Sequence, residues 1–279
     1  MLVAPSVGAL LLWMLVPLAM TLWFSLQRYS LLHPEVRGFA GLSNYALLLE
    51  DSALWTALGN TLLLAGWVLV VTLGLGTLLA VLFDQAFPGA RAARLLAIAP
   101  FFVMPTVSAL LWKNMMFDPV HGILAWVATS LSLKPIDWLA ELPMTSVVVI
   151  LSWQWLPFAL LILVTAMQSL DREQVEAART DGAGPLAIFF HVVLPHLRRA
   201  QTMVILIETI FLLAVFAEIF VTTQGGPGLA TTNLPYLIYL RALVEYNVGS
   251  ASAGGMIAVV LANLAALFLL RLVGRNLET

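Results

Sequence analysis

The sequence contains no cysteine, and only 10% of its 279 residues are charged. Disulfide bonds, thiolate metal ligands and cysteine nucleophiles are therefore excluded. Soluble domains carry about 25% charged residues, so a chain this poor in charge cannot cover a water-exposed surface. The formal net charge is −2, which argues against a nucleic-acid partner, because phosphate binding needs clustered lysine and arginine.

The motifs of several enzyme classes are missing as well. A phosphate-binding loop needs Gly-Lys before Ser or Thr, but neither of the two lysines, Lys113 and Lys134, follows a glycine. The sequence has no His-Glu-x-x-His metalloprotease motif and no Gly-x-Ser-x-Gly nucleophile motif. We therefore expect no catalytic residue, no metal site and no cofactor bound by this chain.

Apolar residues are abundant: they make up 61% of the chain, and the mean hydropathy is +0.98. A helix that crosses a bilayer needs roughly 20 mainly apolar residues. The sequence predicts an all-α, polytopic membrane protein, with one transmembrane domain over residues 1–279 and six membrane-spanning helices. The predicted spans are about 4–27, 57–83, 95–116, 144–168, 200–222 and 250–273. Kinks are predicted at the prolines inside them, Pro17, Pro100, Pro105 and Pro157.

The distribution of lysine and arginine between the spans predicts the orientation. Eight lie in the set of segments that contains 84–94, 169–199 and the C-terminal tail, and five lie in the set that contains 28–56, 113–143 and 223–249. Basic residues favour the cytoplasmic side, so we expect both termini in the cytoplasm. Lys113, Asn114 and Asp118, at the outer end of the third span, are expected to form a solvated rim.

The cytoplasmic segment 169–199 predicts two short helices around a glycine. Asp171 and Gln174 are spaced as in a capping box, and a helix over about 172–181 would end at Gly182. Pro185 suits the first position of a second helix, and Pro195 is expected to close or kink it. On these grounds alone, the segment is either a loop on the bilayer surface or a helix pair that docks into a groove of another protein.

The same segment resembles the EAA loop of ABC importer permeases. Glu176-Ala177-Ala178 is followed by three residues, Gly182, nine residues and Val192-Val193-Leu194-Pro195. The family pattern ends in Ile-x-Leu-Pro, so Val192 is the one departure, and it keeps a β-branched apolar side chain.

Segments outside the loop resemble carbohydrate-importer permeases related to the maltose system. These segments are Asn60-Thr61, Phe216-Ala217-Glu218-Ile219 and the turn Gln224-Gly225-Gly226-Pro227, in which Gln224 replaces the first glycine of a usual Gly-Gly-Gly-Pro. The run Thr231-Thr232-Asn233-Leu234, the pair Gly254-Gly255 and the tail 271–277 are similar to the polyol (sorbitol or mannitol) subgroup.

The resemblance implies a type I ABC importer permease fold in a bacterial inner membrane. It also implies a second permease subunit, two cytoplasmic ATPase subunits that bind the ATP, a periplasmic or lipid-anchored solute-binding protein, and contact with membrane lipid. In such importers the EAA loop seats in a cleft of the ATPase. The residues expected to couple the chain to the ATPase are Glu176, Ala177, Ala178, Gly182, Phe189, Phe190, Leu194 and Pro195.

Polar side chains inside the spans are candidates for a substrate pathway. Gln154, Glu208 and Asn263 lie near the middle of three spans, and midplane sites are where alternating-access transporters hold substrate. Amides and carboxylates accept hydrogen bonds from hydroxyl-rich solutes, and the neighbouring Trp153 offers an aromatic face. Glu218, near the outer end of the fifth span, suits an outer gate or a subunit contact. The alternative is that these groups hold helices together.

Three other functions remain open on the sequence. The first is an ABC permease for another sugar or glycoside, including a glycerol-linked solute. The second is an ion-coupled secondary transporter, which would explain Glu208 inside the membrane but not the EAA loop. The third is a structural membrane protein, which the intramembrane polar residues argue against.

Overall fold

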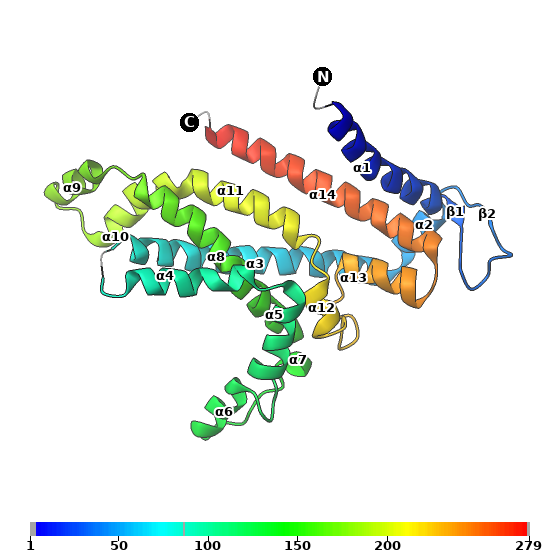
Figure 1. Cartoon of the computed structure of the whole chain (residues 1–279), viewed down its shortest axis with the longest axis horizontal. Helices are drawn as coiled ribbons and strands as arrows, with labels where there is room; N and C mark the ends of the chain where they lie inside the picture. Colours follow the sequence, from blue (N-terminus) through cyan, green and yellow to red (C-terminus); the bar gives the residue numbers. More distant parts are fainter. Residues whose placement is uncertain (1–3, 86, 278–279) are drawn as a thin grey trace.

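A computed structural model describes residues 4–85 and 87–277, and long apolar helices dominate it (Figure 1). Helices α3, α11 and α14 run roughly along the long axis of the molecule, α8 crosses α3 obliquely, and α1 packs beside α14. Helix α9 lies at one end of the molecule, and a small hairpin lies at the other. The long helices are α1 (Ala4–Ser25), α3 (Ser52–Asp84), α8 (Pro143–Gln168), α11 (Leu194–Leu212) and α14 (Val248–Leu277).

Short elements join these helices. The hairpin pairs β1 (Gln27–Arg28) with β2 (Gly38–Phe39) in antiparallel fashion. Helices α5, α6 and α7 project sideways from the long helices (Figure 1). The remaining short helices are α2 (Ser43–Glu50), α4 (Ala90–Ile98), α5 (Pro105–Leu111), α6 (Ile123–Ser130), α7 (Trp138–Glu141), α9 (Arg172–Thr180), α10 (Pro185–Ile188), α12 (Ala217–Val221) and α13 (Leu234–Tyr239). A 3₁₀ turn, η1 (Ala99–Phe102), and three π turns, η2 (Trp112–Met116), η3 (Phe189–Val193) and η4 (Leu240–Val244), extend some of them.

Four of the six predicted spans are long apolar helices, namely α1, α3, α8 and α14. The third predicted span is broken: α4–η1 and α5–η2 meet at an angle of 109°, with Pro100 and Pro105 on either side of the break, as the proline positions predict. Helices α1 and α8 continue through Pro17 and Pro157.

The fifth predicted span is also interrupted. Helix α11 ends at Leu212, and α12 resumes only at Ala217. Helix α11 also carries three charged residues, Arg198, Arg199 and Glu208. Within the described residues, four helices are long and apolar enough to cross a membrane, or five if the bent pair is one span. Six uninterrupted spans are therefore not confirmed.

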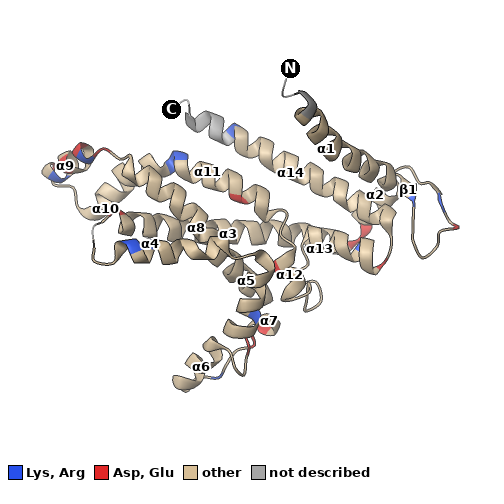
Figure 2. Ribbon diagram, in the orientation of Figure 1, with Lys and Arg blue, Asp and Glu red and all other residues tan. Residues whose placement is uncertain are grey.

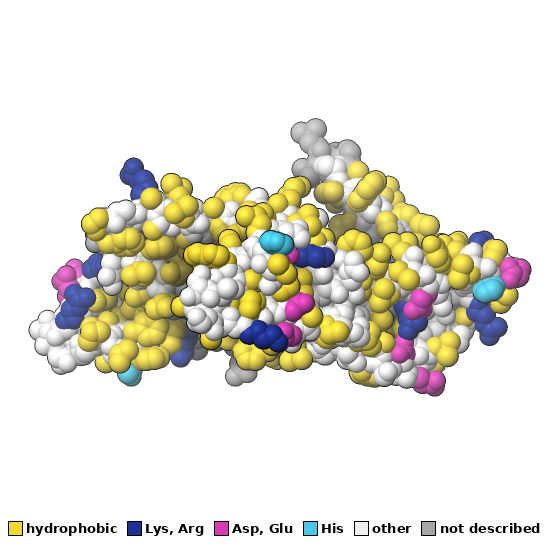
Figure 3. Space-filling model, turned by 90° about the horizontal axis from the view of Figure 1, so that it is seen from below, with side chains coloured by type: hydrophobic (Ala, Val, Ile, Leu, Met, Phe, Trp, Pro, Cys, Tyr) yellow, Lys and Arg dark blue, Asp and Glu magenta, His cyan; other side chains and the backbone are white. Residues whose placement is uncertain are grey.

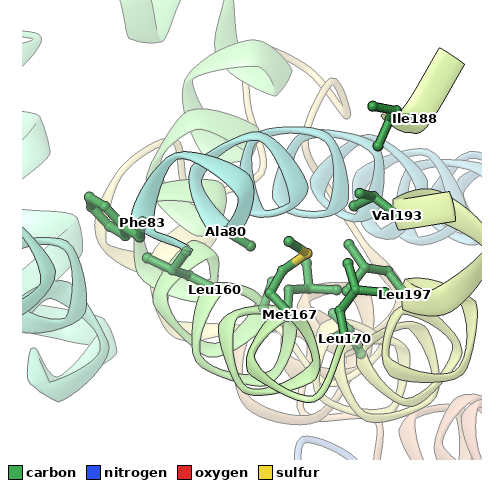
Figure 4. Packing of buried hydrophobic residues seen from close by; sticks show 11 residues of the cluster. Ala80, Phe83, Leu160, Met167, Leu170, Ile188, Val193 and Leu197 are labelled. Atoms are coloured by element: carbon green, nitrogen blue, oxygen red, sulfur yellow. The ribbon is translucent and has the colours of Figure 1, made fainter. Parts of the chain in front are cut away.

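The packed core lies where α3, α8 and α11 meet, and Figure 4 shows the part of it that includes Leu170, Ile188 and Leu197. Lipid tails are as apolar as leucine, so membrane helices associate mainly through close van der Waals packing between small residues. Gly76 of α3 illustrates this: a Cβ atom there would lie 3.2 Å from the Cβ of Ala159 and 3.3 Å from Cδ1 of Leu163 on α8. The absence of a side chain at position 76 thus sets how closely α3 and α8 approach.

The outer surface of the long helices is apolar. Large hydrophobic side chains such as Trp13 on α1 and Leu78 on α3 are exposed, and hydrophobic side chains cover much of the face seen in Figure 3. Charged residues gather at α9, near the hairpin and around α7 (Figure 2). An apolar belt with charges at its ends fits a protein surrounded by lipid.

Substitution of Gly76 tests the close packing of α3 against α8. Gly76→Ile should force the two helices apart, at a cost typical of overpacked cores, about 1–3 kcal/mol. Gly66→Ile is the matched control on the same helix, because a Cβ at Gly66 meets no atom within 4 Å. Thermal unfolding of the detergent-solubilised chain should show a lower Tm for Gly76→Ile than for Gly66→Ile. Equal Tm values would show that the α3–α8 contact does not limit stability.

Candidate functional site

The segment after α8 forms the predicted pair of helices around a glycine. Asp171 caps α9, although its carboxylate accepts from the backbone amide of Glu173, at 2.9 Å, rather than from that of Gln174. Gly182 has a φ of +84°, the left-handed conformation that suits glycine and ends α9. Pro185 is the first residue of α10, as predicted. The sharp bend therefore depends on Gly182.

Pro195 does not close the second helix. Helix α10 continues through η3 into α11, so the chain stays helical from Pro185 to Leu212. A π turn widens the helix by one residue, and η3 ends two residues before Pro195, where the proline ring would otherwise crowd the preceding turn. The expectation that Pro195 closes the helix is wrong, and α10 is instead continuous with the helix that carries Glu208.

The predicted coupling residues divide into exposed and inward-facing groups. Phe189 packs against the apolar cluster between α3, α8 and α11 and contacts the ring of Phe190 edge-on, at 5.1 Å between centroids. Leu186, which was not among the predicted coupling residues, is 74% exposed, and Phe190 is 56% exposed. Half-buried members are Ala178, Phe189 and Leu194, and exposed ones are Glu176, Ala177, Gly182, Phe190 and Pro195. The loop thus presents a mixed charged and apolar surface away from the chain.

Glu208 is fully buried on α11. Its Oε2 accepts a hydrogen bond from the hydroxyl of Thr72 on α3 at 2.7 Å, and its Oε1 has no partner among the described residues. Thr72 was not recognised in the sequence, because a threonine in a long apolar run has no local feature that reveals a partner 136 residues away. One buried carboxylate oxygen thus has no hydrogen-bond partner among the described residues.

Gln154 is buried on α8 beside the break in the third predicted span. Its Nε2 lies 3.5 Å from the carbonyl oxygen of Val103, the residue at the break, and its Oε1 has no partner among the described residues. The next residue, Trp155, contacts Phe211 of α11 at 5.2 Å between ring centroids. Helices α8 and α11 therefore meet close to both Gln154 and Glu208.

The other predicted pathway residues have separate surroundings. Trp153 is half-buried and packs edge-on against Trp112 at the end of the broken span. Glu218 is buried in the first turn of α12. Asn263 is exposed on α14, and its amide donates to the carbonyl of Val259 in its own helix. Contacts thus connect α8, α11 and the broken span, whereas Asn263 lies on an exposed face.

The turn after α12 is held by hydrogen bonds to the start of α3. Asn60 donates to the carbonyls of Leu229 and Thr232, and the hydroxyl of Thr61 accepts from the amide of Leu234. Gln224 adopts a φ of +50°. The residue that replaces a family glycine thus keeps a left-handed conformation.

The predicted solvated rim holds for Asp118 and not for Lys113. Backbone hydrogen bonds from His121 and Val120 lower the pKa of Asp118, which lies in an exposed turn. The ammonium of Lys113 instead donates to the carbonyls of Val221, at 3.0 Å, and Thr222, at 3.5 Å. Lys113 therefore connects the broken third span to the end of α12.

Comparison with known proteins identifies the family. The family model described as "Binding-protein-dependent transport system inner membrane component" matches residues 90–279. The chain belongs to this family. It is also 34% identical over 258 residues to the "Probable ABC transporter permease protein y4oQ" of Sinorhizobium fredii, a match that covers 92% of this chain and 83% of that protein.

Two further relatives are named as transport system permeases, and one solved ABC transporter structure contains a chain of the same fold. The permease is 29% identical to the "Trehalose/maltose transport system permease protein MalF" of Thermococcus litoralis, over 93% of this chain and 87% of that protein. It is 30% identical to the "sn-glycerol-3-phosphate transport system permease protein UgpA" of Yersinia pseudotuberculosis, over 94% and 89%. A chain from a bacterial alginate ABC transporter in complex with alginate pentasaccharide-bound periplasmic protein shares the fold, with a TM-score of 0.79, 20% identity, and 96% and 91% coverage.

These findings confirm an ABC importer permease, a transport subunit rather than an enzyme, in the inner membrane. Segment 169–199, which resembles the EAA loop of ABC importer permeases, therefore lies in a chain of that class. The contacts of Glu176 and its neighbours with an ATPase, and those of Gln154, Glu208, Glu218 and Asn263 with substrate, stay predictions.

The bend at Gly182 can be tested against a second glycine two residues away. A β-branched residue at a positive φ costs about 1–2 kcal/mol, so Gly182→Val should redirect α10. Gly184 has a negative φ of −73°, and a Cβ there meets no atom within 4 Å. Gly184→Val should therefore act as the control.

The measurement is solute uptake and ATP hydrolysis by the assembled transporter in vesicles. Gly182→Val should lower uptake per ATP, and Gly184→Val should leave it near the wild-type value. The same loss in both variants would mean that bulk, not the backbone conformation at Gly182, limits coupling.

Proposed function

We propose that this permease carries a neutral sugar or polyol through the membrane, driven by ATP that partner subunits hydrolyse. The observation that supports this function is the continuity of α10, η3 and α11. One helical path leads from the exposed loop beside Gly182 to the buried carboxylate of Glu208. A displacement imposed on the loop from outside would therefore reach the membrane interior along a rigid element.

The proposed partners are a second permease subunit, two cytoplasmic ATPases and an external solute-binding protein. The chain has no phosphate-binding loop of its own, so the ATP site must lie on another subunit. The exposed Leu186 and Phe190, next to the exposed Glu176, offer the apolar and charged surface that helix-in-groove docking uses. We place this loop and both chain termini in the cytoplasm, on the basis of the lysine and arginine distribution.

The free oxygens of Gln154 and Glu208 support a hydroxyl-rich substrate. Each is a hydrogen-bond acceptor without a partner among the described residues, and sugar hydroxyls are donors. Helix α11 carries Arg198 and Arg199 near its start, but no lysine or arginine is present in α11 beyond them, in α3, in α8 or in α14 up to Leu270. A phosphorylated solute would need such a cation from the second permease, so we propose a neutral solute.

Within that class we propose a polyol. This finer proposal rests on the run Thr231-Thr232-Asn233-Leu234, which resembles the polyol subgroup. Thr231 and Thr232 accept or donate within the turn after α12, and Asn233 caps α13. These residues shape the outer turn and do not contact Gln154 or Glu208. A sugar of the maltose or trehalose kind, as in the name of the Thermococcus relative, is the alternative.

Reconstitution of the complete transporter tests the function. Vesicles that contain this permease, its partner permease and the ATPases, with the binding protein outside, should accumulate a labelled polyol when ATP is inside and no ion gradient is present. Sorbitol, mannitol, maltose, trehalose and glycerol 3-phosphate form the test panel. Uptake that needs an ion gradient and not ATP would contradict the importer and favour a secondary transporter.

Substitution of Gln154 tests the substrate pathway. Gln154→Leu removes a hydrogen-bond partner for a hydroxyl group, worth about 1 kcal/mol, so uptake should fall roughly fivefold to tenfold. Glu208→Gln should also reduce uptake. ATPase assembly and basal ATP hydrolysis should persist in both. Asn114→Leu, which changes an exposed amide at the outer end, is the control. Normal uptake in both pathway variants would leave Gln154 and Glu208 with a structural role only.

A further inference from the structure

Arg172 and Asp84 form an ion pair between the start of α9 and the end of α3. Nη2 of Arg172 lies 2.9 Å from Oδ1 of Asp84, although the two residues are 88 positions apart. The Asp84 side chain is only 14% exposed, whereas that of Arg172 is 67% exposed. We call segment 169–199 the coupling loop. The ion pair joins this loop to α3, which lies far from it in the sequence.

Each charge alone stands at an unfavourable end of its helix. Asp84 is the last residue of α3, where the helix dipole is negative, and Arg172 is the first residue of α9, where the dipole is positive. Each of these placements costs free energy unless an opposite charge compensates it. Asp171 and Glu173 already place negative charge at the start of α9, so the pair mainly compensates Asp84 at the end of α3 and joins the two helices there.

Helix α9 is otherwise loosely attached. None of its residues is buried; only Val175 and Ala178 reach the apolar cluster. A cavity of about 340 Å³ lies behind it, lined by Asp84, Arg172 and Val175 on one side and by Ile188, Phe189 and Val193 on the other. Without the ion pair, α9 has space to shift relative to α3.

Helix α11, which continues from the loop, is tied to the same helix. The amide of Gln201 on α11 donates to the hydroxyl of Thr77 on α3 at 3.1 Å. Thr77 and Asp84 are seven residues apart, so they lie on one face of α3, about 10 Å apart along its axis. Five residues before Thr77, Thr72 holds the carboxylate of Glu208. Helix α3 thus contacts α9 through Asp84, α11 through Thr77, and the carboxylate of Glu208 through Thr72.

From this geometry we infer that Arg172 and Asp84 are positioning residues that make α9 and α3 move as one body during transport. Displacement of α9 by the ATPase then moves α3, and α3 carries the movement to the Thr72–Glu208 contact. The inference rests on the proposed function, since it needs an ATPase that pushes on the loop. It adds a second route to the membrane interior beside the continuous α10–α11 helix.

Neutral substitutions test the ion pair. Asp84→Asn and Arg172→Gln should each lower solute uptake per ATP hydrolysed by about fivefold, the scale of one partly exposed ion pair. Binding of the ATPase and basal ATP hydrolysis should stay near wild type, because Glu176, Leu186 and Phe190, the exposed residues proposed to dock, are unchanged. The charge-exchanged double variant, Asp84→Arg with Arg172→Asp, should recover uptake per ATP. Arg91→Gln, which neutralises an exposed arginine at the start of α4, is the control.

The absence of cysteine allows a second test that does not depend on charge. Asp84→Cys with Arg172→Cys should show the same reduced uptake per ATP, and a short bifunctional thiol reagent that joins the two sites should restore it. Failure of the cross-link to restore uptake would show that α9 and α3 separate during the cycle and would overturn the inference.

The outcome for the wild-type transporter keeps the two proposals apart. ATP-driven uptake in the wild type with unchanged uptake per ATP in Asp84→Asn and Arg172→Gln would overturn only the role of the ion pair. Wild-type vesicles that take up no solute with ATP would contradict the proposed function and, with it, this inference.

Discussion

The structure depends on one constraint of the membrane interior, which is that a backbone group released from a helix must find another partner. Each interruption of a long helix in this chain is met by a polar side chain from elsewhere. Gln154 approaches the carbonyl of Val103 at the break in the third predicted span. Asn233 donates to the carbonyl of Val215 between α11 and α12, and Lys113 donates to the carbonyls where α12 ends. Gln154, a candidate for substrate contact, is therefore also one of the side chains that approach a break in a long helix.

For Gln154 and Glu208, attachment to a neighbouring helix and contact with substrate do not exclude each other. Gln154 uses its amide nitrogen on the backbone and keeps its carbonyl oxygen free, and Glu208 uses one carboxylate oxygen on Thr72 and keeps the other. A side chain fixed by one bond loses less conformational entropy when its second polar atom meets a ligand. Attachment to a neighbouring helix is thus compatible with the proposed contact of these acceptors with substrate.

Local chemistry made part of the fold predictable. The bend at Gly182 and the start of α10 at Pro185 follow from backbone preferences of single residues, and the ranges of α1, α3, α8 and α14 follow from apolar length. Pairs that are distant in the chain were not predictable: Thr72 with Glu208 and Lys113 with Val221 are more than 100 positions apart. The break in the third span falls where kinks were predicted, at Pro100 and Pro105. The break in the fifth span was missed, because hydropathy reports burial in lipid and not continuity of the helix.

The sign of a charge at a helix end can indicate a distant ion-pair partner, which the length of an apolar run cannot. Asp84 ends a 33-residue helix that has no other charged residue, and Arg172 begins α9, so each has the wrong sign for its position. A chain with so few charges is expected to place them where they have partners, because an unpaired charge near the bilayer is costly. Searching for charges of the wrong sign at helix ends would have suggested the contact of Arg172 with Asp84 from the sequence, and would have identified α3 as the helix to which the coupling loop is attached.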